Sequence, residues 1–140
     1  MNRGSSLKAI PQCDPGGILT HEQVLYAAGT KILTNDDTGF AEAVAAAKRA
    51  DIVLTAVGED PLWMTGEAAS RAHLGLPGNQ QQLLEAVAAT GKPIVLIVFS
   101  GRPLVLDWAA NHVPAVLQAW FPGVPPWCEY CLAMSIRASS

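Results

Sequence analysis

The stretch that decides the fold is DIVLTAV, residues 51–57. It is almost continuous in apolar and β-branched side chains, a pattern typical of a strand buried on both faces. A second run of this kind, PIVLIVF, follows at residues 93–99, and PAVLQAW at 114–120 is a third strand candidate. Such strands occur mainly in parallel sheets that helices cover. We therefore expect an α/β fold.

Helix-forming segments alternate with these strands. FAEAVAAAKRA at residues 40–50 combines strong helix formers with basic residues at its C-terminal end, where the helix dipole favours them. Residues 79–90 are predicted as a second helix, with Asn79 as N-cap and Gly91 as C-terminal stop. The segment 104–112 is predicted as a short helix or an irregular segment. This alternation predicts a three-layer α/β sandwich with a mostly parallel sheet covered by helices.

The chain of 140 residues is the size of one domain. Residues 1–23, rich in Gly, Ser and Pro, are predicted to form an irregular lead-in. The α/β sandwich domain is expected over residues 24–123, and its first segment, VLYAAG at 24–29, is a short strand candidate. Residues 124–140 show no hydrophobic periodicity. We interpret them as an atypical, disordered tail, which a shifted reading frame would explain.

Bulk composition excludes several classes of function. The net charge of −3 and the scattered positions of the 9 Lys and Arg argue against a nucleic-acid partner, which requires clustered basic residues. No apolar segment has the length of a membrane span or the pattern of a signal peptide, so a cytoplasmic location without membrane contact is expected for the sequence as written. Cys128 and Cys131 have CxxC spacing without a second pair, so neither a metal nor a cofactor is expected.

The loop after the first strand carries most of the residues that can do chemistry. Parallel sheets bind ligands beyond the carboxyl ends of their strands, so this loop is expected to line a binding crevice. Within it, Glu67 follows Trp63 and precedes Arg71. A carboxyl group beside an aromatic ring in a partly dry crevice has a raised pKa and can act as a general acid. The alternative interpretation is a surface ion pair between Glu67 and Arg71.

Three further residues near this edge are candidates for substrate binding. Glu59 follows the strand end and is suited to accept hydrogen bonds from a ligand hydroxyl or from the backbone of its own loop. His73 is interpreted either as a base or as an ordinary packed or surface histidine. Arg102 suits an anion or braces its turn. Trp63, whose ring can stack on a sugar, and Arg71 complete the predicted substrate-binding set.

Six short motifs follow one another through the chain. They are VGE at 57–59, EAASR at 67–71, LGLPGNQ at 74–80, TGKPIVL at 90–96, GRPL at 101–104 and AWFPG at 119–123. Their order and spacing resemble the C-terminal α/β sandwich domain of glycoside hydrolase family 3, the β-glucosidases and β-xylosidases. The resemblance is greatest to the bacterial periplasmic β-glucosidases.

The resemblance implies retaining glycoside hydrolysis shared between two domains. In this family a (β/α)₈-type barrel supplies the aspartate nucleophile and most of the sugar pocket. The second domain contributes the acid/base glutamate, and Glu67 is the matching position here. Retaining chemistry requires two carboxyl groups about 5–5.5 Å apart. The sequence as written contains no barrel and departs from the family after AWFPG, so a truncated domain is expected, whereas full-length members are often periplasmic.

Three functions follow as expectations. The first is a glycosidase-like hydrolase fragment that lacks its nucleophile and has little or no glycoside turnover. The second is hydrolysis of small esters or lactones, in which the exposed carboxylates or His73 activate water. The third is a non-catalytic domain that binds a sugar or a protein. In each case the partner is a small molecule or a protein, and the face that the barrel normally covers is expected to favour self-association.

Overall fold

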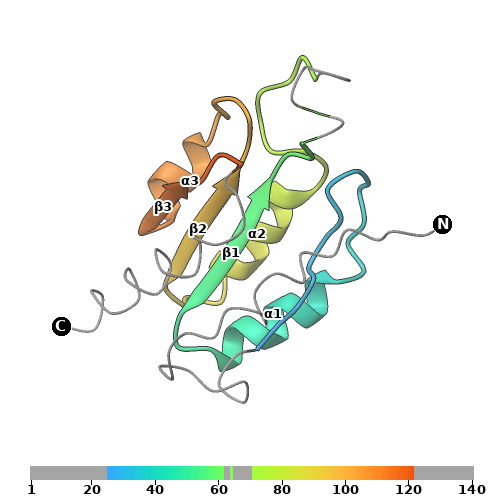
Figure 1. Ribbon diagram of the computed structural model, residues 1–140. Coiled ribbons are helices and arrows are strands. Elements are labelled where there is room, and N and C mark those ends of the chain that lie inside the picture. Colours follow the sequence, from blue (N-terminus) through green and yellow to red (C-terminus); the bar gives the residue numbers. More distant parts are fainter. Residues whose placement is uncertain (1–24, 62–63, 65–70, 122–140) are drawn as a thin grey trace, which may run out of the picture. The chain divides into compact units, whose positions relative to one another are not determined.

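The computed structural model describes residues 25–61, 64 and 71–121. In chain order these residues form α1 (Phe40–Arg49), β1 (Val53–Gly58), α2 (Gln80–Ala88), β2 (Ile94–Phe99), α3 (Asp107–His112) and β3 (Ala115–Gln118), as Figure 1 shows. Tyr26–Phe121 forms one compact unit. The predicted lead-in 1–23 and the predicted tail 124–140 lie outside the described residues.

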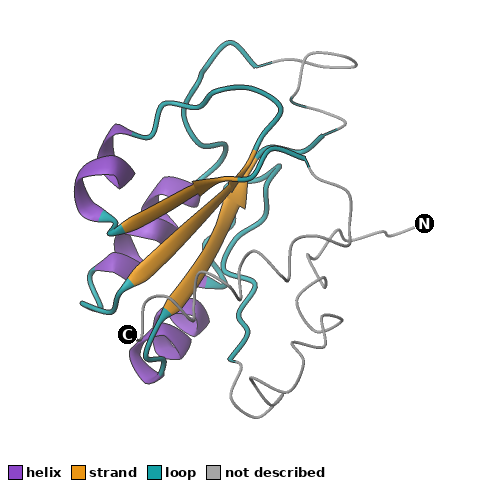
Figure 2. Ribbon diagram, turned by 60° about the vertical axis from the view of Figure 1, so that its left-hand side comes forward, coloured by secondary structure: helices purple, strands orange, loops and turns teal. Residues whose placement is uncertain are grey.

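The three strands form a single parallel sheet in the order β1-β2-β3. Gly58 at the end of β1 pairs with Phe99 at the end of β2, and Val95 of β2 pairs with Ala115 of β3. A helix joins each strand to the next, as parallel neighbours require. Figure 2 shows α2 and α3 against the same face of the sheet. The predicted α/β fold with a parallel sheet is confirmed.

The hydrophobic core consists of buried side chains from the three helices, from β1 and β2, and from the C-cap of α3: Ala47, Val57, Leu83, Leu84, Val87, Ile94, Leu96, Val98, Ala109 and Val113. Alternate residues of β2 point into it, and Leu96 and Val98 are fully buried. The core residues of α2 are spaced by three and four positions, which puts them on one helix face. This packing holds the strand ends in place beneath the loops that follow them.

One predicted strand is not formed in the described part of the chain, and one predicted helical segment is shorter than expected. VLYAAG, a predicted strand, forms no strand over its described part, residues 25–29. The backbone turns there, because Gly29 has a φ of 70° and Thr30 donates its N–H to the carbonyl of Ala28 at 2.9 Å. In the segment 104–112, only Asp107–His112 is helical.

Asn79 is the N-cap of α2, as predicted, but its side chain makes no capping hydrogen bond. Instead its Oδ1 accepts a hydrogen bond from Thr30 Oγ1 at 2.5 Å. The side chain therefore ties the N-terminus of α2 to the loop that precedes α1.

That loop contains an aspartate with a strongly lowered pKa. Lys31 Nζ lies 2.8 Å from Asp36 Oδ2, while Thr38 donates to Oδ1 from its hydroxyl at 2.6 Å and from its backbone N–H at 3.1 Å. The bond from Lys31, and then those from Thr38, lower the pKa of Asp36 well below its ordinary value of 3.8.

A pH-dependent stability follows from this pKa. Since the pKa of Asp36 is lower in the folded chain, its stabilising contribution is complete above 3.8 and is lost as the pH falls through the folded-state pKa. We expect Asp36→Asn to lower the urea midpoint at neutral pH, and the difference from the unsubstituted chain to shrink in strong acid. Urea unfolding over a pH series measures this, with Asp37→Asn controlling for the loss of a charge. A difference that stays constant with pH would contradict it.

Candidate functional site

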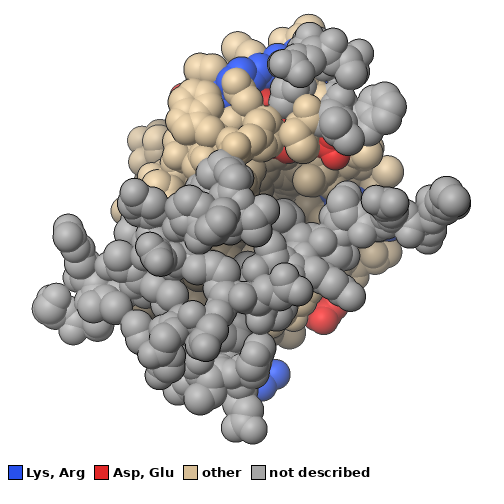
Figure 3. All heavy atoms as spheres, viewed as in Figure 1, with Lys and Arg blue, Asp and Glu red and all other residues tan. Residues whose placement is uncertain are grey.

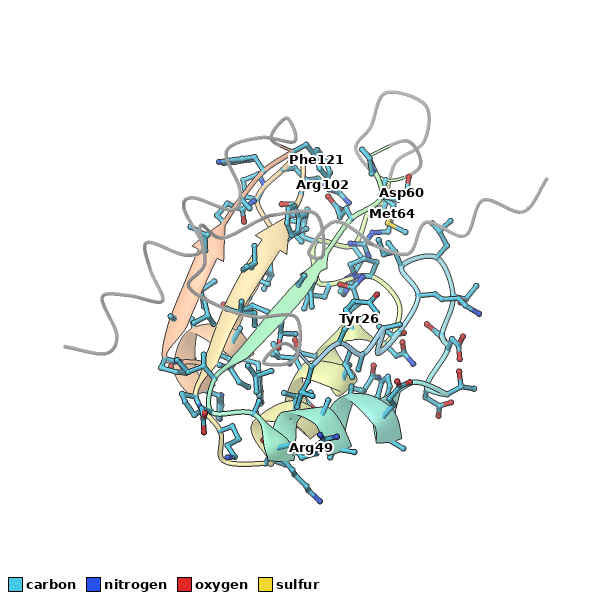
Figure 4. The ribbon with its side chains drawn as sticks, turned by 60° about the horizontal axis from the view of Figure 1, so that its bottom comes forward. Tyr26, Arg49, Asp60, Met64, Arg102 and Phe121 are labelled. Carbon is cyan, nitrogen blue, oxygen red and sulfur yellow. The ribbon has the colours of Figure 1, made fainter. Side chains whose placement is uncertain are left out.

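The predicted site residues that the structure describes gather at the carboxyl edge of the sheet. Glu59 follows β1 directly, Arg102 lies in the turn after β2, and Arg71 and His73 belong to the connection between β1 and α2. Figure 4 shows Arg102 and Phe121 together at this end of the sheet. The carboxyl edge is where open parallel sheets bind ligands.

Glu59 is the centre of the site. Its side chain is 0% exposed, and Oε1 accepts hydrogen bonds from Arg102 Nη2 at 2.8 Å and Nε at 3.1 Å, and from Arg71 Nη2 at 3.3 Å. A carboxylate removed from water is stable only when it is paired and hydrogen-bonded. Figure 3 shows Lys and Arg atoms beside Asp and Glu atoms at the end of the molecule toward which the strands point. The two guanidiniums supply the pairing that a carboxylate requires in this buried position.

The two arginines also bind backbone carbonyls. Arg102 Nη1 donates to the carbonyl oxygen of Arg71 at 2.6 Å, and Arg71 Nη2 donates to that of Gly75 at 2.6 Å. Each guanidinium therefore binds Glu59 and the 71–75 loop at once. We name Glu59, Arg71 and Arg102 the Glu59 clamp. It holds two positive charges and one negative charge, and the buried Nε of Arg71 makes no hydrogen bond with the described part of the chain.

Gln80 is a site residue that sequence reasoning missed. Its side chain accepts a hydrogen bond from the N–H of Gly58 at 2.7 Å and donates one to the carbonyl of Gly58 at 2.9 Å. The next N–H, that of Glu59, donates to the carbonyl of Phe99 at 2.8 Å. The backbone is therefore fixed on both sides just before the Glu59 side chain. One signal was available: Gln80 is a polar residue at the first position of the stripe that continues with Leu83 and Leu84.

A second missed pair shapes the turn that carries Arg102. Ser100 is fully buried, and its Oγ donates to the carbonyl of Arg102 at 2.7 Å and accepts from Gln118 Nε2 at 2.8 Å. Gln118 ends β3, so the hydrogen bonds run from β3 through Ser100 to the turn after β2. This buried serine acts in the structure as a brace for the turn of Arg102.

The rim of the site is exposed and partly apolar. His73 is exposed, and its Nδ1 accepts the N–H of Gly75 at 3.0 Å, so the neutral ring carries its proton on Nε2. Val105 donates its N–H to the carbonyl of Leu74 at 2.8 Å, which keeps the two loops side by side. Leu74, Val105 and Trp120 are 47%, 52% and 51% exposed. These three apolar side chains are therefore partly exposed to solvent at the site instead of being buried in the core.

Two predicted site residues, Glu67 and Trp63, lie outside the described residues. The general-acid role of Glu67 and its ion pair with Arg71 therefore stay predictions. Within residues 25–61, 64 and 71–121, no group of three or more His, Cys, Asp or Glu side chains is arranged to hold a metal ion. In the same residues, no helix is long and apolar enough to span a membrane.

Comparisons with known proteins agree on one family. The profile described as "Glycosyl hydrolase family 3 C-terminal domain" matches residues 5–125. The chain is 38% identical over 104 residues to a β-xylosidase of Formosa agariphila, covering 74% of this chain and 14% of that protein. It is 46% identical over 82 residues to the periplasmic β-glucosidase of Salmonella typhimurium, covering 59% of this chain and 11% of that protein. The chain thus spans a small part of these relatives.

Solved structures of family 3 enzymes are also similar to this chain. A GH3 exo-β-xylosidase (XlnD) in complex with a xylobiose aziridine activity-based probe superimposes with a TM-score of 0.69 and 31% identity, covering 81% of this chain and 15% of that one. A β-glucosidase from Listeria innocua in complex with glucose has a TM-score of 0.61 and 38% identity, covering 68% of this chain and 13% of that one.

Proposed function

This chain belongs to the glycosyl hydrolase family 3 C-terminal domain family and is related to β-glucosidases and β-xylosidases, and from this premise we propose that it supplies the general acid/base of a retaining glycosidase site. The proposed acid is Glu67, the glutamate of the EAASR motif. The second carboxyl group and most of the sugar pocket are supplied by a barrel domain, as the resemblance implies.

One observation supports this role. Arg71, which closes the EAASR motif, is held at the carboxyl edge of the sheet by Glu59 and Arg102. Four residues of extended chain span at most about 14 Å, so an acid four positions before Arg71 needs to reach only a short way to serve a ligand at the edge where parallel sheets bind them. The buried carboxylate of Glu59 is a poor candidate for the same role, because two guanidiniums already occupy it.

The chemistry is proton transfer to and from the glycosidic oxygen. In the first step Glu67 protonates the leaving oxygen while the carboxylate of the other domain attacks the anomeric carbon. In the second step Glu67, now ionised, deprotonates the water that releases the sugar. The proposed substrates are β-glucosides or β-xylosides, the two classes that the names of the relatives give.

A graft tests the proposal. Residues 5–125 replace the matching segment of a family 3 β-glucosidase, and the graft is compared with its Glu67→Ala and Glu85→Gln variants. We expect Glu67→Ala to lower kcat/KM on a phenyl glycoside by about 10²–10⁴-fold, because a poor leaving group requires protonation. The kcat/KM on a dinitrophenyl glycoside should fall far less, because dinitrophenolate leaves without being protonated. Added azide should restore turnover by Glu67→Ala, because azide attacks without the help of a base. Glu85→Gln, an exposed carboxylate change on α2, should leave both substrates unaffected.

Equal turnover of the phenyl glycoside by the graft and its Glu67→Ala variant would refute the acid role. The unmodified chain is assayed in parallel with aryl glycosides, an aryl ester and a lactone. Ester or lactone turnover that persists without glycoside turnover would favour the alternative hydrolase, and sugar binding without any turnover would favour the non-catalytic domain.

A further inference from the structure

The connection between β1 and α2 is unusually long for an α/β fold. It runs from Glu59 to Asn79, whereas such connections typically contain about 2–6 residues. Connections of this length in compact domains are usually either functional loops or linker segments, and functional residues are concentrated on loops that a rigid scaffold positions. The two ends of its first part, Glu59 and Arg71, lie twelve positions apart and are joined by an ion pair.

Arg71 is held by its side chain and by its backbone. Its Nη2 donates to Glu59 Oε1 at 3.3 Å and to the carbonyl of Gly75 at 2.6 Å, while its own carbonyl accepts Arg102 Nη1 at 2.6 Å. A single ion pair would fix only the side chain. The additional bond to the carbonyl fixes the path of the main chain on entry to residues 72–75.

The hydrogen bonds of Arg102 converge on the same point. Its Nε and Nη2 bind the Glu59 carboxylate, which leaves Nη1 directed at the backbone of Arg71. A planar guanidinium can make these bonds together, and a lysine ammonium cannot reproduce that geometry. Ser100 donates to the carbonyl of Arg102 and accepts from Gln118, which stabilises the turn.

We propose that Glu59 and Arg102 are positioning residues for the acid/base step, because they hold the main chain at Arg71, four residues after Glu67. This inference rests on the proposed role of Glu67. A general acid must lie within hydrogen-bonding distance of the leaving oxygen, and a displacement of about 1 Å lowers the rate up to about 10²-fold. The Glu59 clamp serves as the fixed point from which the acid is placed.

The first experiment measures the Glu59 clamp in the full chain. Trypsin cleaves after Arg71 only when the guanidinium and the Arg71 carbonyl both leave their partners. We expect Arg102→Lys to speed cleavage of the Arg71–Ala72 bond about tenfold relative to cleavage after Lys31, whose side chain is 73% exposed. Thr90→Ala, which removes a hydrogen bond to Val87 at the far end of α2, controls for general destabilisation. An unchanged cleavage ratio in Arg102→Lys would overturn the proposal.

The second experiment separates positioning from folding. In the graft, Arg102→Lys should lower kcat on a phenyl glycoside by about 10–100-fold and leave KM nearly unchanged. It should have little effect on kcat/KM for a dinitrophenyl glycoside, because this quantity reports only the glycosylation step, in which that leaving group needs no proton. Equal losses on both substrates, or none, would overturn the positioning role. If Glu67→Ala has no effect on either substrate, the proposed function fails instead, and the trypsin result still reports on the Glu59 clamp.

Discussion

Replacing Gly58 with alanine is expected to abolish the folded state of the chain. A Cβ at this position would lie 1.8 Å from the carbonyl oxygen of Phe99 and 2.7 Å from its carbonyl carbon. Gly58 also has a φ of 147°, a backbone conformation that residues with a side chain rarely adopt. The carbonyl group of Phe99 cannot move away to relieve this clash, since Phe99 pairs with Gly58 in the sheet and its carbonyl accepts the N–H of Glu59 at 2.8 Å.

The expected cost exceeds about 4 kcal/mol, close to the whole stability of a domain this small. Circular dichroism during urea unfolding should show no cooperative transition for Gly58→Ala. Gly91→Ala is the matched control, because Gly91 has a φ of 73° but nothing within 4 Å of the added Cβ. That control should cost about 1–2 kcal/mol. Similar midpoints for the two variants would show that the close approach to Phe99 does not limit this position.

Glu59→Gln is expected to have the next largest effect. The substitution keeps the shape of the side chain but removes the negative charge that Arg71 and Arg102 share in the described part of the chain. Removing one partner of a buried ion pair costs about 3–5 kcal/mol, and the lower end applies here because each guanidinium side chain is 22% exposed. We therefore expect a loss of about 3 kcal/mol in the free energy of unfolding.

Urea unfolding of Glu59→Gln, Arg102→Gln and the double variant measures this coupling. The double variant should be more stable than the sum of the two single losses predicts, because the charges that it removes compensate each other. Glu85→Gln on the exposed side of α2 should change stability by less than about 0.5 kcal/mol. Strict additivity would mean that the Glu59–Arg102 contact contributes little to stability.

The core elements were predictable because each is encoded by a local pattern. The apolar runs at 51–57 and 93–99 gave β1 and β2 to within two residues at each end. The alternation of strands and helices was enough to predict parallel pairing, since antiparallel strands need no helical crossover. The strand predicted at VLYAAG was wrong over its described residues, because a short apolar run carries no information about the turn at Gly29.

The Glu59 clamp could not be predicted from local spacing. Sequence spacing suggested Glu67 as a partner of Arg71, and that pair stays a prediction, whereas the partner that the described residues show is Glu59, twelve positions away. Glu59 and Arg102 are 43 positions apart, and they meet because Gly58 and Phe99 are paired in the sheet. That register depends on the packing of the whole sheet.

The bonding of Gln80 to Gly58 has a consequence for assembly of the sheet. Of the described strands, β1 lies at one edge, and the N–H and carbonyl of Gly58 point away from β2. Unpaired groups on such an edge are a template for the strand of another chain and a starting point for aggregation. The carboxamide of Gln80 satisfies both groups as a neighbouring strand would. One side chain therefore blocks the addition of a foreign strand at the end of β1 that carries the site.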